Sequence, residues 1–193
     1  MVKYHEIRMA MKTGDLVLFS GEGFVSNLIK LATRSKYSHV GMVLKINQFD
    51  FIALWESTTL NSAGDINGQY VKGVQISQLS ARIDDFEGEV YWRPLQWPIG
   101  HDGLLKLAQL RQELKGRRYE TSENELFKSV YDGILGNNEH DLSSVFCSEL
   151  VAEAYQTVGL LSADRPSNEF TPADFGIISD LRNNSLKSAI RLK

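Results

Sequence analysis

The chain has 193 residues, 42% of them hydrophobic and 23% charged, which is typical of one folded domain with a substantial core. The formal net charge of −3 argues against a nucleic-acid-binding protein, because such proteins usually carry a basic surface. No apolar run is long enough to cross a bilayer, and charged residues interrupt the N-terminal segment where a signal peptide would be apolar. We therefore expect one cytoplasmic domain over residues 1–193, without an integral membrane segment.

The first half of the chain is predicted to be rich in strands separated by turn residues such as Gly14-Asp15. The predicted elements are a strand at residues 16–19, a helix at 24–33, and strands at 38–46, 51–57, 70–79 and 88–95. The two strands before and after Asn47-Gln48-Phe49-Asp50 are typical of a β-hairpin.

The second half is predicted to be helical. Apolar residues recur at helical spacing in residues 103–114 and 147–161, and a further helix is expected at 122–135. Strands followed by helices favour the α+β class. We expect an antiparallel, barrel-like β part packed against helices, one of which carries the only cysteine.

That cysteine, Cys147, lies at the predicted start of the helix at 147–161. The ordinary interpretation of a lone cysteine is a small buried hydrophobic residue. The first turn of a helix, however, has backbone N–H groups without partners and a partial positive charge, which together favour a thiolate. The same N–H groups could hold the oxyanion of a tetrahedral intermediate, so the position also suits a nucleophile.

The hairpin supplies a base and a carboxylate. A two-residue turn at Asn47-Gln48 would pair His39 directly with Glu56, and Gly41 with Leu54. Directly opposed side chains share a face of the sheet, with Cβ atoms about 4.5–5.5 Å apart. A carboxylate at that distance can hold one imidazole nitrogen while the other faces a thiol, as in a nucleophile–base–orienter triad. An incidental surface ion pair is the alternative interpretation.

Several segments occur in a characteristic order: GDLVLF at residues 14–19, YSHVGMV at 37–43, FCSELV at 146–151 and TPAD at 171–174. Together, with a Glu shortly after the His, they resemble the circularly permuted branch of the NlpC/P60 cysteine peptidase superfamily, the YiiX/YaeF-like proteins of papain-like fold. In that branch the His strand precedes the Cys helix, as it does here. The resemblance covers about residues 12–176.

The resemblance implies a permuted papain-like fold in which Cys147 is the nucleophile, His39 the base and Glu56 the orienting acid. Tyr37, two residues before the His, and Ser148, next to the Cys, are candidates for the substrate or oxyanion site. The related lecithin:retinol acyltransferase-like enzymes usually have a second His in place of Glu56. They also have Asn-Cys-Glu-His where this chain has Phe-Cys-Ser-Glu, a difference that favours amide hydrolysis over acyl transfer.

The sequence thus predicts a cysteine hydrolase of the peptidase or amidase type that forms an acyl-enzyme. Its expected substrate is a peptide, an amino-acid conjugate or a lipid-like small molecule, with an amide bond in a cell-wall peptide or an N-acyl amino acid as the target. No metal and no organic cofactor are expected. Two alternatives stay open: a thiol acyltransferase or lipase acting on lipid esters, and a non-catalytic binding protein that keeps the fold.

Overall fold

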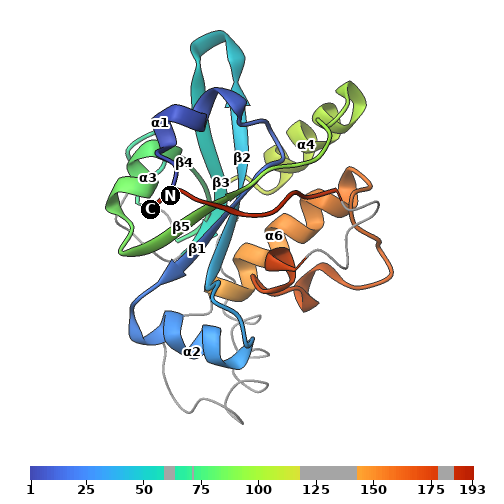
Figure 1. Cartoon of the computed structure of the whole chain (residues 1–193). Helices are drawn as coiled ribbons and strands as arrows, with labels where there is room; N and C mark the ends of the chain where they lie inside the picture. Colours follow the sequence, from blue (N-terminus) through green and yellow to red (C-terminus); the bar gives the residue numbers. More distant parts are fainter. Residues whose placement is uncertain (59–63, 71, 118–142, 178–184) are drawn as a thin grey trace.

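A computed structural model describes residues 1–58, 64–70, 72–117, 143–177 and 185–193 of the chain. These residues form a six-stranded antiparallel sheet in the order β4-β3-β2-β1-β5-β6 (Figure 1). The strands are β1 (Leu16–Gly21), β2 (His39–Ile46), β3 (Phe51–Thr58), β4 (Gly73–Gln78), β5 (Gly88–Arg93) and β6 (Ile190–Arg191). The sheet is open rather than barrel-like, because no pairing among the described residues joins its edge strands β4 and β6.

The helices surround this sheet and confirm the α+β class. The α-helices are α1 (Tyr4–Ile7), α2 (Phe24–Ala32), α3 (Leu79–Asp85), α4 (His101–Glu113) and α6 (Ser143–Thr157). Short 3-10 helices are η1 (Arg8–Ala10), η2 (Asn47–Phe49), η3 (Ser167–Glu169) and η4 (Asp174–Gly176). None of the described helices is long and apolar enough to span a membrane.

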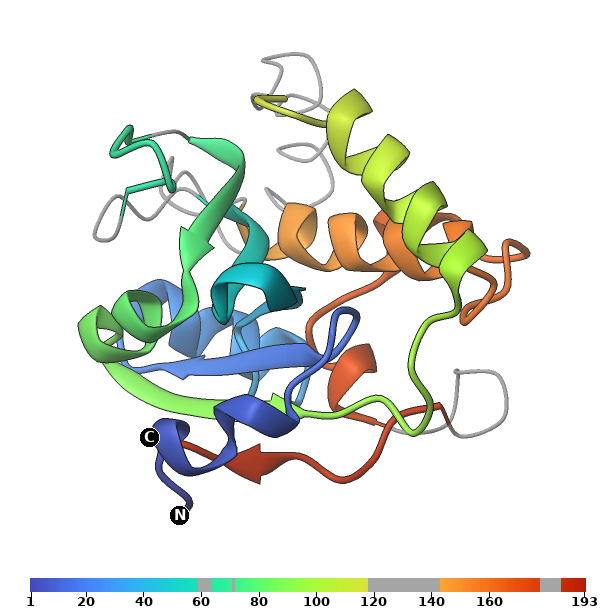
Figure 2. The same ribbon diagram turned by 90° about the horizontal axis from the view of Figure 1, so that it is seen from above.

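Both faces of the sheet are covered. On one face Leu18, Val40 and Met42 share a core with Leu107 of α4 and Val151 of α6. Figure 2 shows α4 and α6 together on that side of the sheet, with α1 on the other. Side chains alternate between the two faces of a strand, so a strand covered on both sides needs a continuous apolar run. The segment LVLF at the start of β1 meets that requirement.

The opposite face packs against α3 and the N-terminal helix. There Val17, Phe19 and Val43 of the sheet share a second core with Leu79 and Ile83 of α3. The two ends of the chain lie side by side (Figures 1 and 2), and the backbone N–H of Val2 donates to the carbonyl of Arg191 at 3.0 Å. Since α3 covers this face, any polar group that points into it is removed from water.

Most predicted elements are found within a few residues of their expected bounds. The strand predicted at residues 70–79 is found as β4, but the helix α3, which follows it at once from Leu79, was not predicted. Leu79, Arg82 and Ile83 have the i, i+3, i+4 spacing of a helical face, which explains the change. The helix predicted at residues 122–135 lies outside the described residues.

Candidate active site

The β2–β3 hairpin has a different register from the one predicted. Met42 pairs with Trp55 and Val43 with Leu54, so each partner on β3 is displaced by two residues from the expected one. The displacement arises at the turn, where η2 and Asp50, which has a positive φ of 45°, replace a two-residue turn. A slip of two residues conserves the face on which a side chain lies, whereas a slip of one would reverse it. His39 and Glu56 therefore still share a face, as diagonal rather than direct neighbours.

Their side chains form a short hydrogen-bonded pair. The Nε2 atom of His39 lies 2.6 Å from Oε2 of Glu56. Diagonal neighbours in a sheet are about 7–8 Å apart at the backbone, a gap that a long glutamate side chain can cross. The pair is sealed from water, since His39 is 5% and Glu56 0% exposed. The contact is one that the predicted orienting role of Glu56 requires, and that role itself stays a prediction.

Gly41 makes the diagonal pairing possible. The register continues to place Gly41 opposite Glu56, between Glu56 and His39 on the same face of the sheet. A Cβ at this position would lie 2.8 Å from Leu54 Cδ1 and 3.2 Å from Glu56 Cβ. A side chain here would occupy the space that Glu56 crosses to reach His39.

We therefore expect Gly41→Ala to separate Glu56 from His39. Overpacking of this kind costs about 1–3 kcal/mol, and a displaced orienting group should lower turnover by about 100-fold. Activity and the denaturant midpoint should both be measured. Gly100→Ala is the matched control, because a Cβ at Gly100 meets no atom within 4 Å. Unchanged activity in Gly41→Ala would show that this close approach does not position the carboxylate.

Glu56 also has an arginine partner that the sequence analysis did not identify. The Nε atom of Arg82, on α3, donates to Glu56 Oε1 at 2.9 Å, and Arg82 is only 2% exposed. Ser77 on β4 donates to the same oxygen at 3.4 Å. The available signal was an arginine at an apolar position of an amphipathic pattern, between Leu79 and Ile83. Such a residue needs a buried partner.

Cys147 reaches His39 from α6. The two side chains are hydrogen-bonded, and because Nε2 is held by Glu56, the ring nitrogen available to the thiol is Nδ1. Cys147 is 0% exposed and belongs to the core between α6 and the sheet. His39 is the first residue of β2, so the nucleophile candidate and its base meet where the strand begins.

The predicted helix start is wrong. The described part of α6 starts at Ser143, which puts Cys147 no earlier than the fifth position of the helix instead of in its first. The unpaired N–H groups of a helix belong to its first turn, and a residue in the fifth position donates its N–H within the helix. The backbone N–H of Cys147 is therefore not one of the free donors that were expected to hold an oxyanion.

Neighbouring charges and hydrogen bonds shift the pKa values of His39 and Glu56. Burial alone would lower the pKa of His39, but the charge of Cys147, its hydrogen bond and Glu56 together raise that pKa to about 9. Burial alone would raise the pKa of Glu56, but the charge of Arg82 and the hydrogen bond with His39 lower it to about 2. The arrangement thus favours a protonated His39 beside an ionised Glu56 at neutral pH.

Tyr37 precedes His39 by two residues, and Ser148 directly follows Cys147. Both side chains are buried. Tyr37 packs edge-on against Tyr91, with ring centroids 5.5 Å apart, and a Cβ at Gly176 would overlap its ring. The Ser148 hydroxyl donates to the carbonyl of Phe170 at 2.5 Å, which ties α6 to the segment that follows it. The predicted oxyanion roles of both residues stay predictions.

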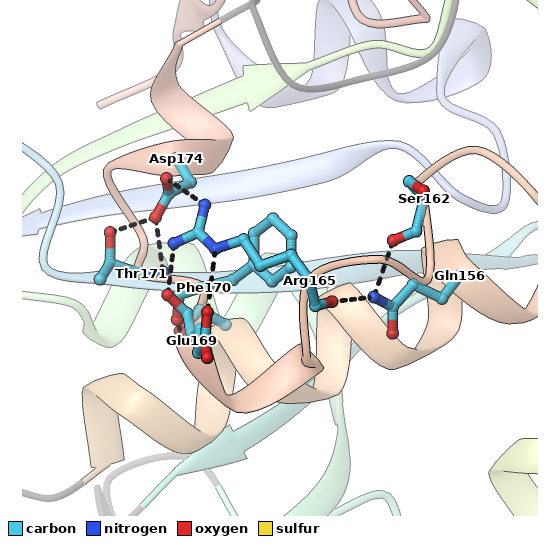
Figure 3. A network of polar contacts seen from close by, with 8 residues as sticks. Gln156, Ser162, Arg165, Glu169, Phe170, Thr171 and Asp174 are labelled. Atoms are coloured by element: carbon cyan, nitrogen blue, oxygen red, sulfur yellow. Dashed lines mark hydrogen bonds and ion pairs between the residues drawn. The ribbon is translucent and has the colours of Figure 1, made fainter.

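The TPAD segment belongs to a network of polar contacts that follows α6 in the chain (Figure 3). Asp174 accepts from the Thr171 backbone at 2.7 Å and from its hydroxyl at 2.6 Å. Arg165 donates to Asp174 at 3.1 Å and stacks on Phe170, 4.1 Å from the ring centroid. Gln156 of α6 donates to the carbonyls of Ser162 and Arg165, as Figure 3 shows. The network fixes residues 162–176 against α6, so the Phe170 carbonyl is held where Ser148 needs it.

The fold resembles that of a bacterial protein of known structure. The chain matches the crystal structure of the metalloprotein yiiX from Escherichia coli O157:H7 with a TM-score of 0.52 and 21% sequence identity. The match covers 93% of this chain and 88% of that one. No family model matches the chain, and no curated protein matches it. The chain therefore has a yiiX-like α+β fold, a likeness that at this identity concerns the fold alone.

Proposed function

We propose that this protein is a cysteine hydrolase of the peptidase or amidase type, with the permuted papain-like fold of the NlpC/P60 superfamily. One observation carries the proposal: His39 lies between the thiol of Cys147 and the carboxylate of Glu56, 2.6 Å from the latter. A nucleophile, a base and an orienting group in hydrogen-bonded series are what covalent acyl transfer requires. The yiiX-like fold supports the same proposal, since the motifs that resemble that family, with the Glu that follows the His, contain these three residues.

In the proposed mechanism the thiol of Cys147 gives its proton to His39, and the sulfur attacks the carbonyl carbon of an amide. His39 then protonates the leaving amine, the C–N bond breaks and a thioester remains. Water hydrolyses the thioester with His39 as base, which releases the acid and restores the thiol. Glu56 holds the imidazole and stabilises its charged form throughout. Tyr37 is our candidate donor to the oxyanion, while we assign Ser148 a supporting role through Phe170.

The mechanism uses no metal ion. The yiiX protein is described as a metalloprotein, but both carboxylate oxygens of Glu56 are engaged here, one by His39 and one by Arg82. Within the described residues, no group of three or more His, Cys, Asp or Glu side chains could hold a metal ion. Because the proposed steps need only Cys147, His39 and Glu56, we expect activity to persist in the presence of a chelator, and the assays below include that condition.

Alkylation of the only cysteine tests the proposal directly. We expect iodoacetamide to modify Cys147 faster than it modifies free cysteine near neutral pH, because an imidazolium partner favours the reactive thiolate. Mass spectrometry of the intact chain measures the rate without a known substrate. The burial of Cys147 is the observation in favour of a non-catalytic binding protein. A modification rate no higher than that of free cysteine would support that alternative.

The reaction type is tested with three substrate classes: peptidoglycan fragments, N-acyl amino acids and phospholipids. A peptidase or amidase should release an amine from one of the first two. Turnover of phospholipids alone, by hydrolysis or acyl transfer, would favour the lipid-directed alternative. Each assay should be repeated with a chelator, where loss of activity would contradict the metal-free mechanism.

The shifted pKa of His39 predicts the alkaline limit of activity. The pKa is raised from 6.5 to about 9, so His39 keeps the proton that the leaving amine needs until the pH approaches 9. A profile of kcat/KM against pH should therefore fall above about pH 9 instead of above pH 6.5. By the same shift, the imidazolium contributes stability that is complete below pH 6.5 and is lost as the pH rises through about 9. Denaturant unfolding across this range measures the second effect.

A further inference from the structure

Arg82 is a buried cation with an incomplete set of partners. Its Nε atom donates to Glu56, but Nη1 and Nη2 are buried without a hydrogen-bond partner among the described residues. The guanidinium carbon lies 5.1 Å from the ring centroid of Phe19 and 5.4 Å from that of Phe86. Unsatisfied buried donors are costly, and well-packed apolar residues often replace a buried ion pair without loss of stability. The stability of the fold therefore does not explain an arginine at this position.

The location of Arg82 relates it to the proposed triad. Phe19 packs on Arg82 and also on His39, with ring centroids 5.3 Å apart in the second contact. Glu56 offers one carboxylate oxygen to His39 and the other to Arg82. Cys147, His39, Glu56 and Arg82 therefore form one continuous series, contributed in turn by α6, β2, β3 and α3.

We propose that Arg82 is a positioning residue that acts through Glu56, which it keeps ionised and turned toward His39. This inference rests on the proposed function. A carboxyl group sealed from water would otherwise take up a proton, and a protonated Glu56 could no longer stabilise an imidazolium. The planar guanidinium also fixes the direction of the carboxylate, because its Nε–H points at a single oxygen.

The groups that face Glu56 support a dominant role for this arginine. His39 from β2 and Arg82 from α3 are the charged groups in contact with it, and the neutral hydroxyl of Ser77 comes from β4. Gln75 donates to Ser77 and so holds that hydroxyl in place. His39 carries a charge only when it is protonated, so Arg82 supplies the permanent one. Its charge is also the foremost cause of the lowered pKa of Glu56.

Two substitutions separate charge from geometry. Arg82→Gln removes the charge and keeps an amide donor, whereas Arg82→Lys keeps the charge and loses the planar group. We expect Arg82→Gln to raise the pKa of Glu56 by about 1–3 pH units. The pH below which the rate of Cys147 alkylation falls, the acid limb of its pH profile, should move upward with that pKa. Arg82→Lys should retain the acid limb. Arg8→Gln is the matched control, because it breaks the surface pair of Arg8 with Asp50, 2.8 Å apart, without touching Glu56.

The carboxyl titration of Glu56 is followed by ¹³C NMR and assigned with Glu56→Gln, so it needs no substrate and no reactive thiol. A wild-type Glu56 that titrates near its ordinary pKa of 4.5 would overturn the inference even if Arg82→Gln does not fold. A shifted carboxyl titration with an unchanged alkylation profile would also overturn it, and would leave Arg82 as a structural ion-pair partner. An unreactive wild-type Cys147 beside a low Glu56 pKa would instead identify the proposed function as the part that fails.

Discussion

Cys147→Ser is expected to lower turnover by about 10⁴–10⁶-fold, the loss that follows removal of the nucleophile from a cooperating triad. A hydroxyl is far harder to ionise than a thiol, so the charged pair with His39 would not form. The variant should stay folded, because serine differs from cysteine by one atom and can still donate to the imidazole. Turnover of an amide substrate measures the effect, and thermal unfolding provides the control.

The single cysteine makes this experiment unambiguous. Every thiol-directed label on the wild-type chain reports Cys147, and Cys147→Ser should take up none. Turnover that survives the substitution within tenfold of wild type would mean that the thiol is not the nucleophile. The hydrolase proposal would then have to be abandoned, whatever the geometry around His39.

Glu56→Gln is expected to lower turnover by about 10⁴-fold, because an amide in this position selects the wrong tautomer of His39. Glu56 accepts from His39 Nε2, which leaves Nδ1 free to take the thiol proton. A glutamine NH₂ would donate to Nε2 instead, so Nδ1 would carry the proton and could not act as a base. The pKa of His39 should also fall from about 9, which NMR titration of the imidazole measures.

Glu56→Gln should also destabilise the fold, because Glu56 has a second partner, Arg82, outside the β2–β3 hairpin. Arg82 would remain buried without its negative partner, and breaking such a pair costs about 3–5 kcal/mol. Glu89→Gln is the matched control, since it breaks the partly exposed pair with Arg191, 2.6 Å apart, on β5. Denaturant unfolding compares the two variants. Full activity in a folded Glu56→Gln protein would remove this carboxylate from the mechanism.

Local sequence was enough to identify most of the strands and helices, although not α3, and to single out Cys147, His39 and Glu56 as candidates. The polar turn at Asn47 to Asp50 predicted a hairpin, and the pairing expected across it put His39 and Glu56 on one face. That prediction survived an incorrect register because the error was an even number of residues. The turn was misjudged since Asn47 to Asp50 forms a 3-10 helix and a residue with positive φ, a choice that short polar segments leave open.

The start of α6 could not be predicted from its apolar spacing. The sequence Ser143-Ser144-Val145-Phe146 forms no Ser/Thr-x-x-Glu capping box, so the apolar pattern that begins near Cys147 suggested a later start. The difference changes the chemistry, because a cysteine in the second turn does not lie beside the free N–H groups. The oxyanion donor must therefore be sought elsewhere, with Tyr37 as the present candidate.

The sequence by itself determined the α+β class, the order of the His strand and the Cys helix, and the face that His39 and Glu56 share. These features depend on short-range periodicity, which neighbouring residues specify directly. Only the tertiary structure decided that Arg82 joins Glu56, that Gly41 leaves room for the carboxylate, and that the thiol of Cys147 reaches His39. Each of these contacts joins residues from different elements, and their distance depends on how helices pack on the sheet, which local pattern does not specify.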